Sequence, residues 1–267
     1  MLDALLQNGL LLLVFMLAAW IASAIIGKVS FVDGLWGLTI AALLSFLSAE
    51  SGEAQLVLML MVVIWGVRLG VHLLRRFNRN GEDARYRTML PSPDAGMGYA
   101  IAALKKVFLL QTALIMLVSS PAQVGILAAW EGQYLPLWGW PGIALYAVGL
   151  FFEWVGDWQL ARFKADPANE GKVMDEGLWR YTRHPNYFGD ACVWWGIFIV
   201  ALSIAPGALI WTLPGPLFLT FTLVKWSGAG MTEDAMRDKY GEDFARYAER
   251  TSAFIPAPPK RKEQHGG

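Results

Sequence analysis

The sequence predicts an all-α integral membrane protein, a bundle of seven transmembrane helices with the N-terminus outside and the C-terminus inside. The chain of 267 residues is 55% hydrophobic and only 16% charged, whereas soluble domains carry about 25% charged residues. Seven apolar runs approach the length of about 20 residues that crosses a bilayer. The Lys and Arg residues gather on one side of the membrane that these runs define, as cytoplasmic loops do.

The seven predicted spans follow one another along the chain. They lie at roughly Ala4–Ile26, Phe31–Ala49, Ala54–Leu74, Ile101–Ser119, Leu137–Leu160, Phe188–Ile204 and Ala208–Trp226. We interpret the first as a retained helix and not as a signal peptide, because its start lacks Lys and Arg and another span follows at once.

The orientation follows from the connections between the spans. With the N-terminus outside, all 22 basic residues fall on or towards the inner side. The inner side receives Lys28, Arg75–Lys106, Arg162–Arg183 and everything after Lys225. The outer connections Glu50–Gln55, Ser120–Pro136 and Ala205–Gly207 contain no Lys or Arg. This asymmetry is the positive-inside pattern, and an even number of spans would break it.

The chain is predicted to be one membrane domain, residues 1–255, followed by a Pro-rich, charged and disordered tail, residues 256–267. A single cysteine, Cys192, excludes an internal disulfide and a multi-cysteine metal site, and we predict no metal. A formal net charge of zero gives no reason to expect nucleic acid as a partner. We expect a monomer that contacts membrane lipid.

The helix that precedes the second long inner loop carries acids inside an apolar run. Glu153 and Asp157 lie four residues apart, on one helix face, and Lys164 follows seven residues after Asp157. Acids within a membrane segment are costly and usually face the bundle interior or water. Two interpretations stay open, pairing with basic loop residues or a polar ligand site.

The stretch "GLWRYTRHPNYFGDACVWWG", Gly177–Gly196, places many hydrogen-bonding groups before an apolar run. Its arginines, with Lys164 and Lys172, can gather near a phosphate, and its aromatic side chains can stack on a flat ring. An aromatic belt with positive charges on the inner side accounts for Arg, Trp and Tyr. It does not account for Asn186 and Asp190, which share one helix face.

The same stretch resembles the C-terminal signature of the steroid 5-alpha-reductase-like membrane proteins, in particular their bacterial branch. Sterol C14- and delta-7-reductases share a similar Arg-His-Pro-Asn-Tyr core, and the ending "YAERTSAFIP" is similar to the family's close. The resemblance covers Phe151–Pro256 well and the first half more loosely. It implies an enzyme that uses NADPH, bound inside the helix bundle from the cytoplasmic face. The reaction is reduction of a carbon–carbon double bond conjugated to a carbonyl, in a lipophilic, steroid-like small molecule from the bilayer.

The resemblance also implies site residues. Cofactor binding falls to Asp157, Lys164, Lys172, Asn186, Tyr187 and Asp190. It also falls to the arginines Arg68 and Arg79, whose alternative role is to anchor the topology. The polar cluster adds Trp179, Tyr181, Arg183 and His184 to this set. Glu153 stands where the steroid reductases have Asn, and their late histidine has no counterpart here.

For catalysis, the family uses an acid on its second helix that a Tyr on its third helix assists. Asp33 in "KVSFVDGLWG" matches the acid, and Trp65 falls near the position of the Tyr. In an apolar cleft Asp33 can stay protonated and donate a hydrogen bond to the carbonyl oxygen. Alternatively, Ser30 and Asp33 form a capping box at the helix start. Both interpretations stay open.

Two other classes of protein fit parts of the sequence. Isoprenylcysteine carboxyl methyltransferases carry a similar "RHP-x-Y-x-G" and bind S-adenosylmethionine. Lys164 and Lys172 favour NADPH instead, because its additional phosphate needs cations. A transporter could use the intramembrane acids for an ion path, but the sequence shows no inverted repeat.

Overall fold

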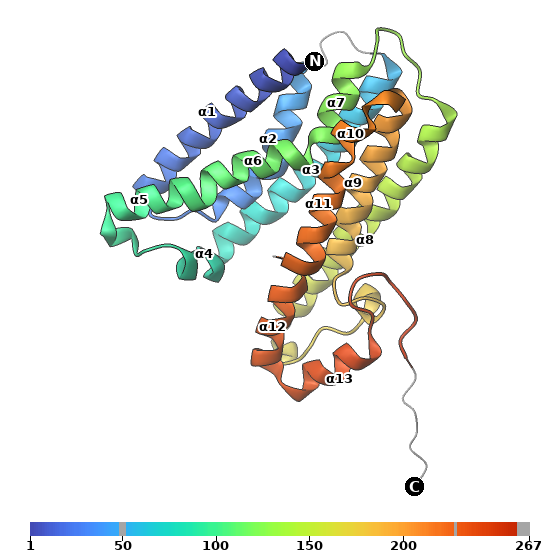
Figure 1. Ribbon diagram of the computed structural model, residues 1–267. Helices are drawn as coiled ribbons and strands as arrows, with labels where there is room; N and C mark the ends of the chain where they lie inside the picture. The colour runs from blue at the N-terminus through green and yellow to red at the C-terminus, as the bar shows by residue number, and fades with distance from the viewer. Residues whose placement is uncertain (48–51, 227–228, 261–267) are drawn as a thin grey trace. The chain divides into compact units, whose positions relative to one another are not determined.

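The computed structural model describes residues 1–47, 52–226 and 229–260. This part of the chain is 81% helical and contains no strand; one isolated bridge pairs Thr182 with Ser252. The predicted all-α class is therefore confirmed. The helices are α1 (Leu2–Ile26), α2 (Phe31–Leu47), α3 (Glu53–Asn80), α4 (Ala84–Met89), α5 (Met97–Ala103), α6 (Leu109–Val118), α7 (Ser120–Ala128), α8 (Trp140–Ala165), α9 (Pro185–Ile204), α10 (Leu209–Thr212), α11 (Pro214–Phe221), α12 (Ala229–Tyr240) and α13 (Glu242–Arg250) (Figure 1).

Among the described residues, five helical stretches are long and apolar enough to cross a membrane, as expected of a multi-pass membrane protein. They are Leu2–Ile26, Glu53–Asn80, Met97–Val118, Pro185–Ile204 and Pro206–Tyr240. The other two predicted spans correspond to α2 and α8. These helices are present, but neither is among the five.

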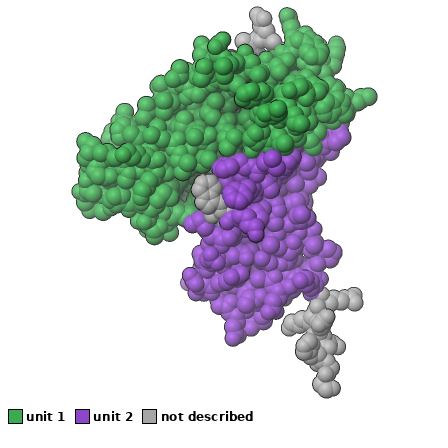
Figure 2. Space-filling model, viewed as in Figure 1, with its two compact units in different colours: residues 1–140, 197–215 green, residues 141–196, 216–267 purple. Residues whose placement is uncertain are grey.

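The chain divides into two compact units (Figure 2). Unit 1 comprises residues 1–140 and 197–215, and unit 2 comprises residues 141–196 and 216–267. Of the predicted disordered tail, residues 261–267 lie outside the described part of the chain. Within the described part, Ala257 and Lys260 donate backbone hydrogen bonds to the carbonyls of Tyr181 and Arg250.

In unit 1, α2 and α3 pack with their backbones in contact, which only glycine permits. A Cβ atom on Gly37 would lie 2.3 Å from the carbonyl oxygen of Gly66, and one on Gly70 would lie 2.9 Å from that of Gly34. A residue with a side chain at either helix would push the pair apart. The contact fixes the start of α2, with Asp33, beside the end of α3.

The rest of unit 1 is tied together by buried polar contacts between apolar helices. Asn8 in α1 donates to Gln123 in α7 over 2.9 Å, and Trp20 donates to the carbonyl of Ala100 over 2.7 Å. Polar groups away from water are costly unless they are paired, so these bonds specify which helix faces meet.

In unit 2, α8 meets the first half of α9 along glycines spaced seven residues apart. A Cβ atom on Gly149 would lie 2.6 Å from the carbonyl oxygen of Gly189, and one on Gly196 would lie 2.6 Å from that of Gly142. Small residues at a seven-residue repeat let two helices approach closely along a continuous seam. This seam determines where the acids of α8 meet α9.

Candidate functional site

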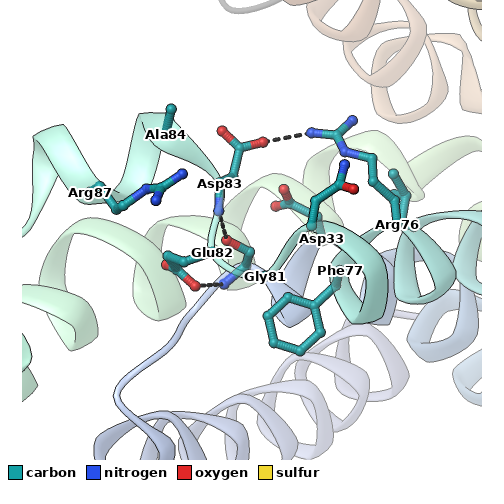
Figure 3. A pocket seen from close by; sticks show the side chains of 11 residues that line it. Asp33, Arg76, Phe77, Gly81, Glu82, Asp83, Ala84 and Arg87 are labelled. Atoms are coloured by element: carbon teal, nitrogen blue, oxygen red, sulfur yellow. Dashed lines mark hydrogen bonds and ion pairs between the residues drawn. The ribbon is translucent and has the colours of Figure 1, made fainter. Parts of the chain in front are cut away.

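A pocket of about 260 Å³ lies in unit 1, where α2 begins and α3 ends. Its lining consists of Ser30, Asp33, Leu73, Arg76, Phe77, Asn80, Gly81, Glu82, Asp83, Ala84 and Arg87. Figure 3 shows Arg87 from α4 on one side and Asp33 with Arg76 on the other, with Asp83 between them. Most of this lining is polar or charged, so the pocket suits the polar end of a ligand.

The pocket faces away from the surface of α3 that suits lipid. The four α3 residues of the lining recur at helical spacing on one face: Leu73, Arg76, Phe77 and Asn80. The exposed apolar residues of the same helix recur on the opposite face: Leu56, Leu60, Ile64, Val67 and Val71. A membrane lipid that packs on the apolar face therefore does not reach the pocket from that side.

The loop after α3 and the start of α2 cap each other. The carboxylate of Glu82 accepts from the backbone N–H groups of Val29 (3.1 Å) and Ser30 (3.2 Å). In return the Ser30 hydroxyl accepts from the N–H of Asp83 at 2.7 Å. Glu82 thus satisfies free N–H groups at a helix start, where a negative charge is also favourable. These bonds fix the loop over the pocket.

Asp33 joins this loop through its side chain. One carboxylate oxygen accepts from the Tyr86 hydroxyl at 2.6 Å, and the other accepts from the Arg85 guanidinium at 3.1 Å. The sequence had suggested a capping box of Ser30 with Asp33. In the structure both side chains bond to the loop after α3, Ser30 through Asp83 and Asp33 through α4.

The charged side chains of the loop after α3 form ion pairs with one another and with α3. Asp83 accepts from Arg76 at 2.6 Å and from Arg85 at 3.1 Å. Burial opposes ionisation of Asp83, but the hydrogen bonds and positive charges of Arg85 and Arg76 outweigh it and lower the pKa of this carboxyl to about 2. Burial and the neighbouring carboxylate of Asp33 raise the pKa of Tyr86 well above its usual range. Tyr86 therefore stays a hydroxyl donor.

A chain of hydrogen bonds approaches Asp33 from the opposite side. The indole N–H of Trp36 donates to the side-chain oxygen of Gln111. The amide of Gln111 donates to the Tyr86 hydroxyl at 3.4 Å, and Tyr86 donates to Asp33. Because the indole N–H can only donate, the direction of every bond in this chain is determined.

The site residues that the sequence predicts in unit 1 do not all line the pocket. Asp33 lines the pocket, whereas Trp65, Arg68 and Arg79 are not among the described residues that line it. Trp65 is 1% exposed and belongs to the core of unit 1, and Arg79 is exposed in the last turn of α3. The sequence reading missed Arg85 and Tyr86. Both lie in the run "GEDARY" directly after α3, which matches no motif that would indicate their contacts.

In unit 2 the structure brings together two predicted residues. The amide of Asn186 donates to a carboxylate oxygen of Asp157 at 3.0 Å. Asp157 is 9% exposed and Glu153, one turn earlier, is 3% exposed. Asp190 follows one turn after Asn186 on α9. The described contact pairs an acid with an amide between two helices, and a polar ligand site at these residues stays a prediction.

Two predicted cofactor residues form a set of contacts with α12 and with the end of α13, which we call the clasp. Arg183 and His184 both contact one oxygen of Glu233, at 2.9 and 3.1 Å. Arg183 also donates to the carbonyl of Thr251 at 2.6 Å. The His184 ring stacks on that of Tyr187, with centroids 5.3 Å apart. The sequence reading missed Glu233, although an acid in the first turns of a polar helix after the last span was a visible signal.

Other predicted residues divide between the interior and the surface of unit 2. The indole N–H of Trp179 donates to the carbonyl of Gly156 at 3.0 Å, and the Trp179 carbonyl accepts from Tyr247 at 2.6 Å. Tyr181 is 44% exposed, and Lys164 and Lys172 are also exposed. The exposed group can meet a ligand from the aqueous side, while Trp179 holds the loop against α8.

Comparison with known proteins bears on both regions. Residues 19–251 match the family model described as a protein of unknown function, DUF1295. The chain belongs to the DUF1295 family. This is the steroid 5-alpha-reductase-like family that the C-terminal motif resembles.

A distant relative of this DUF1295 protein is the "Uncharacterized protein C594.04c" of Schizosaccharomyces pombe. The two are 24% identical over 277 positions, which cover 92% of this chain and 78% of the relative. No solved structure matches the chain. The matched residues include both the Asp33 pocket and the Asp157–Asn186 pair, so both lie within the DUF1295 region.

Proposed function

We propose that this DUF1295 protein is a membrane reductase that uses NADPH to reduce the carbon–carbon double bond of a lipophilic, steroid-like enone. The observation that carries the proposal is the Asp157–Asn186 hydrogen bond of 3.0 Å between α8 and α9. Buried acids in such helices commonly mark ligand or ion sites. The acids alone indicate only a polar ligand, and the resemblance of the C-terminal motif to steroid 5-alpha-reductase-like proteins supports a reductase cofactor as that ligand.

The proposed setting is a seven-span protein of a bacterial inner membrane, with its cofactor site on the cytoplasmic side. The basic residues predict this orientation. Exposed aromatic side chains at the predicted outer connection and at the start of the next span are consistent with a membrane–water boundary there, because Trp and Tyr concentrate at both boundaries. In unit 1 these are Trp130, Tyr134, Trp138 and Trp140, which are 47–77% exposed.

The residues of unit 2 fit NADPH in part. Lys164 and Lys172 are exposed cations that can bind its phosphates, and the exposed ring of Tyr181 can stack on a flat base. Asp157 and Asn186 offer an acceptor and a donor for the amide or ribose groups. Other predicted cofactor residues have structural partners: Trp179, Arg183 and His184. When bound, the cofactor would supply the hydride.

The substrate carbonyl needs a hydrogen-bond donor, because reduction of the double bond places negative charge on its oxygen. The family resemblance implies a protonated Asp33 in this role, with Trp65 shaping the pocket, and the alternative is a capping role for Asp33. Since Asp33 accepts from Arg85 and Tyr86, we now assign the donor role to Arg87. Arg87 lines the pocket. Its backbone N–H donates to the carbonyl of Asp83, and its side chain has no hydrogen bond or ion pair to any described residue. Its guanidinium is always charged and can meet the oxygen directly.

Cofactor titration of the purified protein in lipid nanodiscs tests the proposal. We expect NADPH to bind, and the variant Asn186→Ala to lose most of that binding. Asn78→Ala, an exposed change on α3, is the matched control. Binding of S-adenosylmethionine without NADPH would contradict the reductase and support a methyltransferase. An NADPH-oxidation screen over steroid-like enones then tests the reaction itself.

A further inference from the structure

The three carboxylates that line the pocket differ in how much hydrogen-bonding capacity they have left. A carboxylate offers about four acceptor positions. Asp83 accepts four described hydrogen bonds, two of them from the side chain of Arg85. Glu82 accepts three from backbone N–H groups. Asp33 accepts two, one on each oxygen, so it is the carboxylate with the most capacity for a ligand.

The direction of the hydrogen bonds shows what kind of group Asp33 can receive. The chain from Trp36 through Gln111 to Tyr86 ends with a proton pointing at Asp33. On the other oxygen, the Arg85 guanidinium supplies a second proton and a positive charge. Both contacts favour the ionised carboxylate over the acid and so oppose the effect of burial, which favours the acid. An ionised carboxylate has no proton to give, and its remaining positions accept from N–H or O–H groups.

The pocket therefore offers opposite chemistry on its two sides. Arg87 donates only, and Asp33 accepts only. A simple ketone satisfies Arg87 but places its oxygen or a C–H group against Asp33. That arrangement desolvates a carboxylate without giving it a partner, which is costly. A ligand with a hydroxyl or amino group near its carbonyl satisfies both sides.

We propose that the pocket of unit 1 selects ligands that carry a hydroxyl or amino donor beside a carbonyl, and that Asp33 is the residue that determines this preference. The recognition step stands on the contacts of Asp33 alone. The further statement that the substrate is a hydroxy- or amino-substituted enone rests on the proposed function.

A matched pair of probes tests the recognition step without any reaction. The first probe is a saturated steroid-like ketone with a hydroxyl on the adjacent carbon, and the second is its methyl ether. Titration into the protein in nanodiscs should give binding of the hydroxyketone at least about 10-fold tighter, the usual effect of a hydrogen bond to a charged group. Equal affinities for the two probes would overturn the proposal.

Substitutions then assign the preference to Asp33. Asp33→Asn should abolish it, because an amide can also donate to the ether oxygen. Asp94→Asn removes an exposed acid outside the pocket lining and should leave the preference intact. Tyr86→Phe frees one acceptor position of Asp33 and leaves its contact with Arg85 in place, so the preference should persist. If Tyr86→Phe loses the preference while Asp94→Asn keeps it, Asp33 is not the selecting group.

The inference about the pocket and the proposed reductase function can each be refuted while the other stands. If the wild-type protein prefers the hydroxyketone but binds no NADPH, the reductase proposal falls and the pocket assignment stands. If the protein reduces a hydroxyenone and its methyl ether with NADPH at equal efficiency, the reductase proposal stands and the selectivity of Asp33 falls.

Discussion

Replacing Gly37 with alanine tests whether the α2–α3 contact shapes the Asp33 pocket. Gly37 lies one helical turn after Asp33, and its α carbon faces the backbone of Gly66. The new methyl group would start 2.3 Å from the Gly66 carbonyl oxygen, whereas real Cβ atoms are essentially never closer than 3.0 Å to another atom. The two helices must therefore separate by at least 3.0 minus 2.3, or 0.7 Å.

The cost follows from the nature of the obstructing atom. A flexible side chain could rotate away, but a backbone carbonyl moves only with its helix. Overpacking of this kind costs about 1–3 kcal/mol. For a chain of this size, that corresponds to a fall in apparent Tm of roughly 2–12 °C. A shift of this size also moves Asp33 relative to Arg85 and Tyr86, so probe binding in the pocket should weaken.

Thermal unfolding in detergent or nanodiscs measures the effect. Gly9→Ala in α1 is the matched control, since its Cβ would make only an ordinary contact of 3.8 Å and should leave Tm nearly unchanged. The double variant Gly37→Ala with Gly66→Ala should cost less than the two separate losses combined, because the first change already separates the helices. A Tm for Gly37→Ala equal to that of Gly9→Ala would refute the backbone contact.

Three further predictions concern the other contacts. Tyr86→Phe should lower the free energy of unfolding by about 1–3 kcal/mol, because Asp33 loses a buried hydrogen bond; chemical denaturation would measure it. Because the folded pKa of Asp83, about 2, lies below the ordinary value, its ion pairs contribute fully above about pH 4 and are lost as the pH falls through about 2. The hydrogen-exchange protection factors of the loop amides should be high at pH 5 and fall only as the pH drops below about 4. A loss of protection between pH 7 and 5 would contradict the assignment. Glu233→Gln should loosen the clasp of α12 and α13 and increase proteolysis near Thr251, whereas Glu242→Gln, which is 92% exposed in its side chain, should not.

Much of the fold could be predicted because it depends on local composition. Apolar runs of sufficient length specify helices whatever their neighbours are, so helices appear at all seven predicted positions. The residues at which the helices begin and end were harder to predict. The helix after Ala54 was expected to end at Leu74, but α3 continues through the basic stretch to Asn80, since Arg and Asn on a solvated turn do not stop a helix. The outer connection was expected to be a loop, yet it contains α7, which begins at Ser120.

The close packing of α8 against α9 has a signal in the sequence. Gly142, Gly149 and Gly156 repeat every seven residues in α8, as Gly189 and Gly196 do in α9. A repeat of this kind predicts close helix packing, but it does not name the partner helix. Likewise, Asp33 was chosen from the sequence, while Tyr86 was not. The two are 53 residues apart, and the α2–α3 packing together with the reciprocal caps of Glu82 and Ser30 brings them together.

The polar stretch after α8 shows why residue type alone could not separate fold from function. Arginine and histidine beside a membrane helix have the same appearance in the sequence whether they bind a phosphate or a carboxylate of the protein itself. Here Glu233 occupies both Arg183 and His184, and each of these side chains is largely buried. A buried cation that already has its counter-ion gains little from a second anion, since the ligand would have to displace Glu233 and leave that carboxylate unpaired. Lys164 and Lys172 are instead exposed, so both can be reached by a cofactor from the aqueous side.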